Sequence, residues 1–256
     1  PGLSWAPCRS LGGGMPHTFD GNGHTISNLY VNVTNTTDAI VHAAMFLQSS
    51  YDMPLIKQLI VDGADVTVNA GALKQGYAGV VASGVDWHGS FQNVTVKNSN
   101  VTGTKYVGGI ASYNSLDWIN CTVTNVTLNV IEHFKADGVS RDLPHVGALV
   151  GLDNAGQVYG NTVSNLTIIV TPPSGQPDRS DRIGTLIGTA QAEVLIGSNA
   201  ISGVTLNGAS YTKLIGLDNR TYKVVNATQM IGYTTIQAAI TAANAGDVIN
   251  VAAGTY

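Results

Sequence analysis

Apolar residues alternate with polar ones in many short runs along this chain, and clusters of Gly, Asn and Asp separate the runs. Residues 19–32, FDGNGHTISNLYVN, show the pattern: a Gly-Asn-Gly turn precedes alternating apolar residues that begin at Ile26. A period of two predicts a strand with one buried face. The tight turn predicts a positive φ at Gly21 and Gly23, a conformation that Asn22 also tolerates.

The same pattern recurs in four segments that align over residues 77–101, 106–130, 145–170 and 182–206. Each has an apolar or small residue and Gly near its start, followed by two or three apolar residues, then passes through a polar turn and continues as an alternating strand containing Val-Thr or Leu-Thr. The spacings between the anchoring glycines are 29, 39 and 37 residues. These glycines are Gly79, Gly108, Gly147 and Gly184.

Repeats of about 20–50 residues are typical of solenoids, propellers and arrays. Each copy holds two or three strands of about five residues, whereas a propeller blade needs four. Variable spacing fits a β-solenoid, in which stacked coils bury a shared core and insertions leave from one corner. We therefore predict one parallel β-solenoid over residues from about 19 to 225, with Cys121 buried where INCTV stacks on FQNVTV. The residues predicted to face inward are Val107, Ile110, Val146, Leu149, Ile183 and Leu186.

Several motifs resemble the GLUG-repeat family. They are HTFDGNGHTISNLYV, VGGIASYNSLDWINCTVTNV and VGALVGLDNAGQVYGNTVSNLTI, and the resemblance covers roughly residues 5–215. The fourth copy departs from the family pattern, because GTAQAEVLIGSN replaces the usual turn. The resemblance implies an all-β fold, a right-handed parallel β-helix or β-solenoid, of the kind found in bacterial and archaeal surface proteins, adhesins and some secreted peptidases. It does not imply one chemistry.

The C-terminal stretch MIGYTTIQAAITAANAGDVINVAAGTY follows a different pattern. Thr234 or Thr235 can cap a short helix, whose apolar residues recur at helical spacing until Asn244-Ala245-Gly246 ends it, and an alternating strand follows. The stretch resembles the opening of pectin-lyase-like right-handed β-helices, where such a helix covers the end of the coil. We expect residues 1–229 to form the GLUG-like solenoid and 230–256 to be the cap and first strand of a second, truncated β-helix. The alternative is an ordinary helix and strand packed on the first solenoid.

Composition excludes some partners. Only 11% of the 256 residues are charged, the net charge is -4, and no basic stripe is visible, which argues against nucleic-acid binding. No apolar run reaches the length of about 18 residues that a membrane-spanning helix needs. The sequence leaves undecided whether the two cysteines, Cys8 and Cys121, form a disulfide, and their spacing does not favour one.

The densest polar clusters are two insertions, EHFKADGVSRDLPH at 132–145 and TPPSGQPDRSDR at 171–182. Both follow equivalent strands, so both should emerge from the same corner and together form a candidate binding site. The alternative is a pair of solvated loops with alternating charges. The candidate residues are Asp137, Arg141, Asp142, Asp178, Asp181 and Arg182.

Two tryptophans, Trp87 and Trp118, each follow an acid in a turn region. If the copies stack, the indoles either line one edge as a platform for sugar rings or plug corners of the core. The acids at equivalent turns are Asp86, Asp117 and Asp153. They either stack into a carboxylate row or serve as turn residues. No His, Cys and Asp set has zinc spacing, and we expect neither a metal site nor a cofactor.

Asn-x-Thr occurs nine times, and the repeat itself favours it by placing Asn before a Val-Thr strand. A host that glycosylates such sequons would modify some of them. We expect stacked neighbours to restrict access at Asn120 and Asn125. The candidate N-glycosylation residues are Asn32, Asn35, Asn93, Asn100, Asn165, Asn219 and Asn226.

These features favour an extracellular or cell-surface segment of a larger adhesin-like protein, a rigid rod that presents loops to a glycan or a surface protein. Self-association through the solenoid ends, as in a filament or sheath, is one alternative. A polysaccharide lyase or hydrolase is another, but a lyase needs carboxylates for calcium and a basic residue, and a hydrolase needs two or three clustered acids. The repeats supply few such residues, so the sequence favours a non-enzymatic role and no catalytic residue is assigned.

Overall fold

The chain folds as strands with one short helix, and its large sheets are almost wholly parallel, as the repeat pattern predicts. An antiparallel sandwich, the alternative for short alternating strands, is excluded for this region. The computed structural model describes residues 5–6, 8–9, 18–48, 55–71, 73–84, 89–114, 116–135, 137–177 and 179–254.

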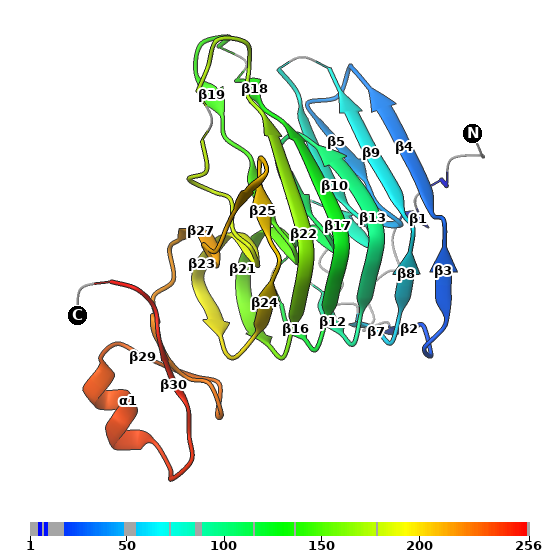
Figure 1. Cartoon of the computed structure of the whole chain (residues 1–256). Coiled ribbons are helices and arrows are strands. Elements are labelled where there is room, and N and C mark those ends of the chain that lie inside the picture. Colours follow the sequence, from blue (N-terminus) through cyan, green and yellow to red (C-terminus); the bar gives the residue numbers. More distant parts are fainter. Residues whose placement is uncertain are drawn as a thin grey trace.

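Three sheets run side by side along the stack of repeats (Figure 1). The smallest contains β5 (Ile40–Ala43), β10 (Gln75–Gly79), β14 (Tyr106–Gly108) and β20 (His145–Gly147). The second contains β3 (Thr25–Ser27), β4 (Tyr30–Asn35), β8 (Ile60–Asp62), β9 (Asp65–Ala70), β13 (Thr95–Gly103), β17 (Thr122–Ile131), β22 (Thr162–Thr171), β24 (Ala200–Ser202), β25 (Thr205–Leu206) and the antiparallel β26 (Ala209–Ser210).

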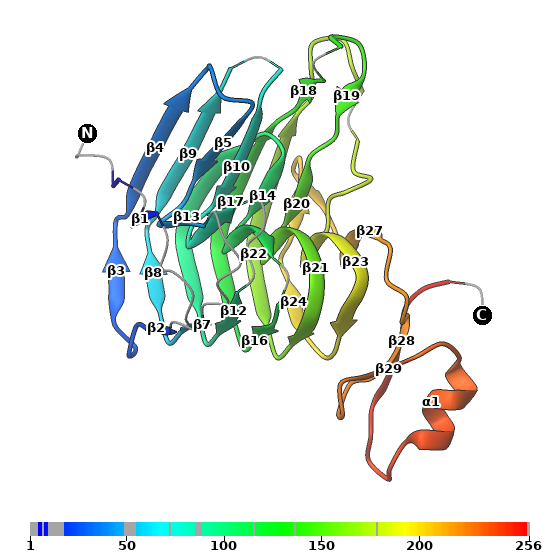
Figure 2. The same cartoon turned by 180° about the vertical axis from the view of Figure 1, so that it is seen from behind.

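The third sheet curls, because its longest strands, β21 (Val150–Tyr159) and β23 (Ile187–Ile196), pass through two sides of the stack (Figure 2). Its remaining strands are β1 (Cys8–Arg9), β2 (Thr18–Asp20), β6 (Phe46–Gln48), β7 (Leu55–Lys57), β11 (Ala82–Gly84), β12 (Ser90–Gln92), β15 (Ala111–Asn114), β16 (Trp118–Ile119) and β27 (Ile215–Asp218).

The repeats stack as layers in register. The anchoring glycines Gly79, Gly108 and Gly147 pair directly across β10, β14 and β20. A Cβ at Gly108 would lie 2.0 Å from the carbonyl oxygen of Ala111, so a larger residue cannot occupy this bend. The glycine therefore anchors each repeat through the close approach of two backbones.

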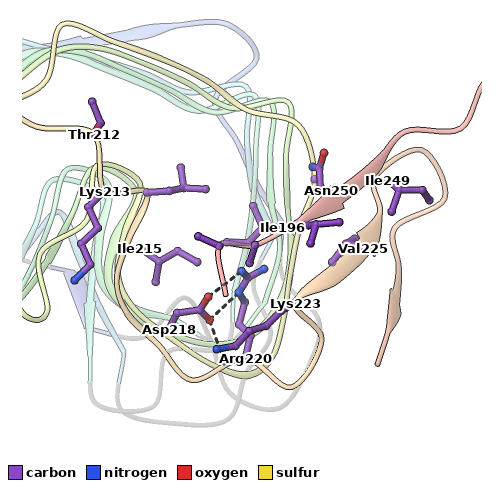
Figure 3. A pocket seen from close by; sticks show the side chains of 15 residues that line it. Ile196, Thr212, Lys213, Ile215, Asp218, Arg220, Lys223, Val225, Ile249 and Asn250 are labelled. Carbon is purple, nitrogen blue, oxygen red and sulfur yellow. Dashed lines mark hydrogen bonds and ion pairs between the residues drawn. The ribbon is translucent and has the colours of Figure 1, made fainter. Parts of the chain in front are cut away.

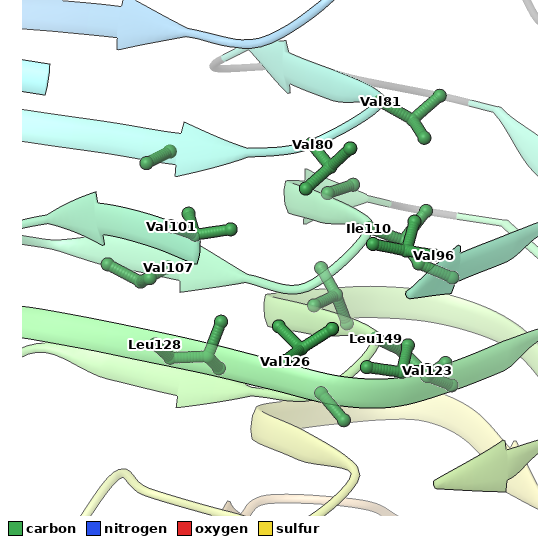
Figure 4. Packing of buried hydrophobic residues seen from close by; sticks show 14 of the residues in the cluster. Val80, Val81, Val96, Val101, Val107, Ile110, Val123, Val126, Leu128 and Leu149 are labelled. Atoms are coloured by element: carbon green, nitrogen blue, oxygen red, sulfur yellow. The ribbon is translucent and has the colours of Figure 1, made fainter. Parts of the chain in front are cut away.

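The interior of the stack is a continuous apolar core (Figure 4). All six residues predicted to face inward are at most 1% exposed, and Cys121 is fully buried. Phe91 and Trp118 occupy the same position in neighbouring layers, and their rings stack at a centroid distance of 4.4 Å. Burial raises the pKa of the Cys121 thiol to about 12, so it is unreactive, while the side chain of Cys8 lies outside the described residues.

The corner residues explain the frequency of Asn. Asn98, Asn125 and Asn165 all have positive φ and stack in successive layers, and the Asn125 and Asn165 amides each donate to the Asn of the preceding layer at 3.1 Å. The opening turn differs in part from prediction: Asn22 and Gly23 have positive φ, but Gly21 does not. Gly21 is needed instead because a Cβ there would lie 2.6 Å from the carbonyl oxygen of Gln58.

The C-terminal residues form a small antiparallel unit beside the last layer. β28 (Val224–Asn226) pairs with β29 (Ile231–Tyr233) and with β30 (Ile249–Val251), and α1 (Ile236–Ala242) packs on them. Thr235 caps the helix by accepting a hydrogen bond from the Ala238 amide, as predicted. No helix in the described part of the chain has the length and apolar character needed to cross a membrane.

Helix α1 should be far less stable than the stack. Only Ala239 is fully buried, and Ile240 is 56% exposed, so the helix gains little from packing. A helix of seven residues is marginal in water without such support. In hydrogen exchange we expect its amides to exchange on the order of a hundred times faster than those of β17 and β22. Equal protection of α1 and β17 would show that the helix is part of the stack's cooperative unit.

Candidate binding surface

The two insertions lie side by side above one corner of the stack (Figure 1). They leave from Ile131 and Thr171, which pair in register at the ends of β17 and β22. The guanidinium of Arg141 joins them, because its Nη1 donates to the carbonyl oxygen of Pro177 across 2.7 Å. The prediction that both loops emerge from the same corner is confirmed.

A buried ion pair closes the first loop. The loop forms a hairpin of β18 (His133–Phe134) and β19 (Arg141–Asp142), and Arg141 Nη2 donates to Glu132 Oε2 at its base. The Glu132 side chain is fully buried. Removing one member of such a pair leaves an uncompensated buried charge, so Arg141 primarily holds the hairpin in place.

A second polar cluster ties the hairpin to the sheet below. Asp142 accepts a hydrogen bond from Lys105 Nζ at one carboxylate oxygen and from Gln75 Nε2, at 2.8 Å, at the other. Tyr77 donates in turn to Gln75 Oε1 at 3.0 Å. Burial lowers the pKa of Lys105, and Asp142 opposes that shift, so the pair persists as an ion pair. The hairpin base is thus fastened to two earlier layers.

A column of aromatic and basic residues lies beside these loops, half-buried at His42, Tyr106 and Arg182 and buried at Tyr77 and His145. His42, Tyr77, Tyr106 and His145 occupy one register position in four successive layers. Their rings pack edge to face at centroid distances of 5.0, 4.6 and 4.7 Å. Arg182 extends the column, since the bridge between Val146 and Ile183 aligns it with His145. We call these five residues the ring column.

The geometry at the end of the ring column fixes the state of His145. Arg182 Nη1 lies 2.9 Å from His145 Nε2. A guanidinium only donates, so Nε2 accepts and the ring is neutral with its proton on Nδ1, which donates to Thr189 Oγ1 at 2.7 Å. Burial, followed by the charges of Lys105 and Arg182, lowers the pKa of His145 to about 2.

The other loop carboxylates that the sequence singled out serve local turns. Asp137 accepts from the amides of Val139 and Ser140 at 2.9 and 2.8 Å, and the first of these bonds is the main cause of its lowered pKa. Asp181 pairs with Arg179 at the exposed tip of the second loop. Asp178 lies outside the described residues.

The tryptophan platform is wrong for Trp118. Its side chain is fully buried against Phe91, so it fills the core, as the alternative held. Trp87, with its neighbouring Asp86, lies outside the described residues. The acids form no row either, because Asp153 pairs in register with Asn114.

Access to the candidate sequons varies. Asn226 is fully buried and donates to Asp247 Oδ2 at 2.8 Å, so a folded chain cannot be glycosylated there and that prediction is wrong. Asn35 is half-buried and its amide oxygen accepts from the Thr37 amide. Of the two restricted sequons, Asn125 is exposed but held in the amide stack. Asn120, the other one expected to be restricted, is exposed, so that expectation is wrong there. The remaining exposed sequon residues are Asn32, Asn93, Asn100, Asn165 and Asn219.

A separate cleft of about 650 Å³ lies between the end of the stack and the antiparallel unit (Figure 3). Ile196, Ile215 and Val225 supply apolar walls. Asp218 and Arg220 neutralise each other through two hydrogen bonds of 3.0 Å, and Lys213 and Lys223 also line the cleft.

Sequence reasoning singled out Arg182 but missed Gln75, Lys105 and the other four residues of the ring column. The signal was present, since Tyr77, Tyr106, His145 and Arg182 are the first residues of the four aligned repeats. Within the described ranges, no group of three or more His, Cys, Asp or Glu side chains is placed to hold a metal ion. No family model, curated protein or solved structure matches this chain.

Proposed function

We propose that this chain is an adhesive segment of an extracellular or cell-surface protein, a rigid rod that presents its two loops and the ring column to a glycan. The observation that carries the proposal is the fastening of the loops. They are bonded to each other through Arg141 and to the stack through Lys105 and Asp142. Such preorganisation lowers the entropy lost on binding.

The rod itself is proposed to be a right-handed parallel β-helix. Support comes from the parallel pairing of successive layers and from the strong general preference of parallel connections for right-handed crossovers. A rod of this kind keeps its loops at a fixed distance from its ends, because each layer adds about 4.8 Å along the axis.

A glycan fits this surface because both combine apolar faces with hydrogen-bonding groups. Sugar rings present apolar C–H faces, which pack on aromatic rings, and hydroxyl groups, which need hydrogen-bond partners. Tyr106 and Tyr113 are both half-buried, with ring centroids 6.0 Å apart; Asn154 donates to the Tyr113 hydroxyl, and Lys105 Nζ lies 5.9 Å from the centroid of the Tyr106 ring. Half-buried aromatic residues with a polar rim are typical of binding surfaces.

A binding experiment with two matched variants tests the proposal. The loop variant combines Val139→Ala, Arg179→Ala and Asp181→Ala, all at exposed positions. The control combines Lys57→Ala and Lys97→Ala, which remove half-exposed charges paired with Asp20 and Asp62.

We expect the unmodified chain to bind a subset of an immobilised glycan array, measured by biolayer interferometry. The loop variant should lose about tenfold or more in affinity at unchanged Tm, and the control should bind normally. Absence of any glycan binding, or equal binding by the loop variant, would contradict the proposal.

A further inference from the structure

Arg182 differs from the other arginines whose side chains the structure describes. Each of the others forms an ion pair with a carboxylate, whereas Arg182 donates to a histidine. No carboxylate of the described residues pairs with it, and its side chain is half-buried rather than free in solvent. The three ion pairs are Arg141–Glu132, Arg179–Asp181 and Arg220–Asp218.

The histidine positions Arg182 without neutralising it. His145 is 5% exposed and is held from behind by Thr189, itself 1% exposed. Its neutral ring accepts one of the five N–H groups of the guanidinium and leaves the others available to a ligand. The guanidinium thus has a fixed orientation and a full positive charge.

The surrounding charges do not cancel that of Arg182. Lys105 and Asp142 neutralise each other, and Lys135 adds a further positive charge within electrostatic range of Lys105. The end of the ring column therefore carries net positive charge on a chain that is negative as a whole. A half-buried cation with open donors favours an oxyanion, and a planar guanidinium matches a carboxylate in a bidentate pair.

Tyr106 supplies a second open donor. Burial raises the pKa of its hydroxyl, which therefore stays protonated, and the hydroxyl has no hydrogen-bond partner in the described part of the chain. Tyr106 lies two layers from Arg182 along the ring column, which corresponds to about 10 Å. That distance is about the span of two linked sugar rings.

We propose that the ring column binds an acidic glycan, with Arg182 holding the carboxylate of one sugar and Tyr106 donating to a hydroxyl of its neighbour. This inference rests on the proposed glycan-binding function and names the ligand class. A uronic acid within a chain and a terminal sialic acid both supply the carboxylate.

The test uses matched pairs of oligosaccharides. One member of each pair carries a uronic acid or a sialic acid, and the other is the same oligosaccharide with the carboxylate reduced to an alcohol. A sulfated glycan is tested as well. We expect the unmodified chain to bind the carboxylated member at least about tenfold more tightly by calorimetry. Arg182→Ala should abolish this preference, and Arg182→Lys should retain only part of it. Lys97→Ala, which removes a cation on β13 outside the loops and the ring column, should leave it unchanged.

His145→Phe tests whether His145 positions the Arg182 guanidinium, because phenylalanine keeps a ring in the column but removes the nitrogen that accepts from Arg182. We expect it to lose the carboxylate preference while neutral glycans bind as before, a split that general destabilisation would not produce. Equal binding of the two members of every pair, tighter binding of the sulfated glycan, or an unaffected Arg182→Ala would overturn this inference and leave the proposed function standing. Failure to bind any glycan would overturn both.

Discussion

Ile110→Asp should unfold the chain. Ile110 is fully buried at the centre of the apolar core, and its backbone amide donates to Leu149 in the next layer, so the site cannot move to solvent without opening the stack (Figure 4). An unpaired buried carboxylate costs several kcal/mol. A domain has only about 5–15 kcal/mol of net stability, so we expect loss of the β-sheet circular dichroism signal or a severe fall in the urea midpoint.

Two controls separate burial from the chemistry of the change. Ile131→Asp makes the same substitution at a residue that is 46% exposed, and should cost about 0.5 kcal/mol or less. Ile110→Val keeps the core apolar and should cost about 1 kcal/mol. A folded Ile110→Asp protein with the stability of Ile131→Asp would show that Ile110 is not in the core.

The fold could be predicted where each layer repeats the same physical requirement. The bend at Gly108 excludes a side chain, and the strand that contains Cys121 needs an apolar residue at each inward position. Such requirements recur in every repeat, so alignment of the copies shows them. Gly21 was predicted for the wrong reason, because positive φ and close backbone contact both select glycine, and only coordinates distinguish them.

The site was harder to predict because its residues change identity from layer to layer. The ring column contains His, Tyr and Arg at one register position, so only the register shows that they form one surface. Trp118 follows an acid in a turn, yet its indole is buried, because β16 begins at Trp118 and pairs it in register with the buried Phe91 of the neighbouring layer. Charge patterning located the loops, but it could not show that Lys105 neutralises Asp142 from an earlier layer.

Asp153 provides the second large effect. It is fully buried, and neither carboxylate oxygen has a hydrogen-bond partner of ordinary geometry in the described structure. Burial raises its pKa well above 3.8, while the nearby indole N–H of Trp118 opposes the shift only in part and Asp117 adds to it. In the preceding layer the equivalent residue is Asn114, which pairs in register with Asp153. Its buried side chain has hydrogen-bond partners, because it accepts from the Gly89 amide and donates to the Leu116 carbonyl.

Asp153→Asn should therefore stabilise the chain, by on the order of 1–3 kcal/mol at pH 8 in urea unfolding. The folded state holds the Asp153 proton more tightly than the unfolded state does, so the wild-type chain loses stability as pH rises from 3.8 toward the raised pKa of Asp153. The gain from the amide should consequently be largest at high pH and should shrink on acidification, as the wild-type carboxyl becomes neutral in both states. Contributions from all other groups cancel in the difference between the two proteins.

The reciprocal change, Asn114→Asp, is the matched control. It creates a second buried carboxylate beside Asp153 and removes the donor to Leu116, so it should destabilise the chain, and more so as pH rises. We expect the two substitutions to have opposite signs at pH 8 and the combined variant, which exchanges the residues between layers, to lie between them. A stability difference between Asp153→Asn and wild type that stays constant from pH 4 to pH 8 would show that folding does not raise the pKa of Asp153, and that its burial is compensated.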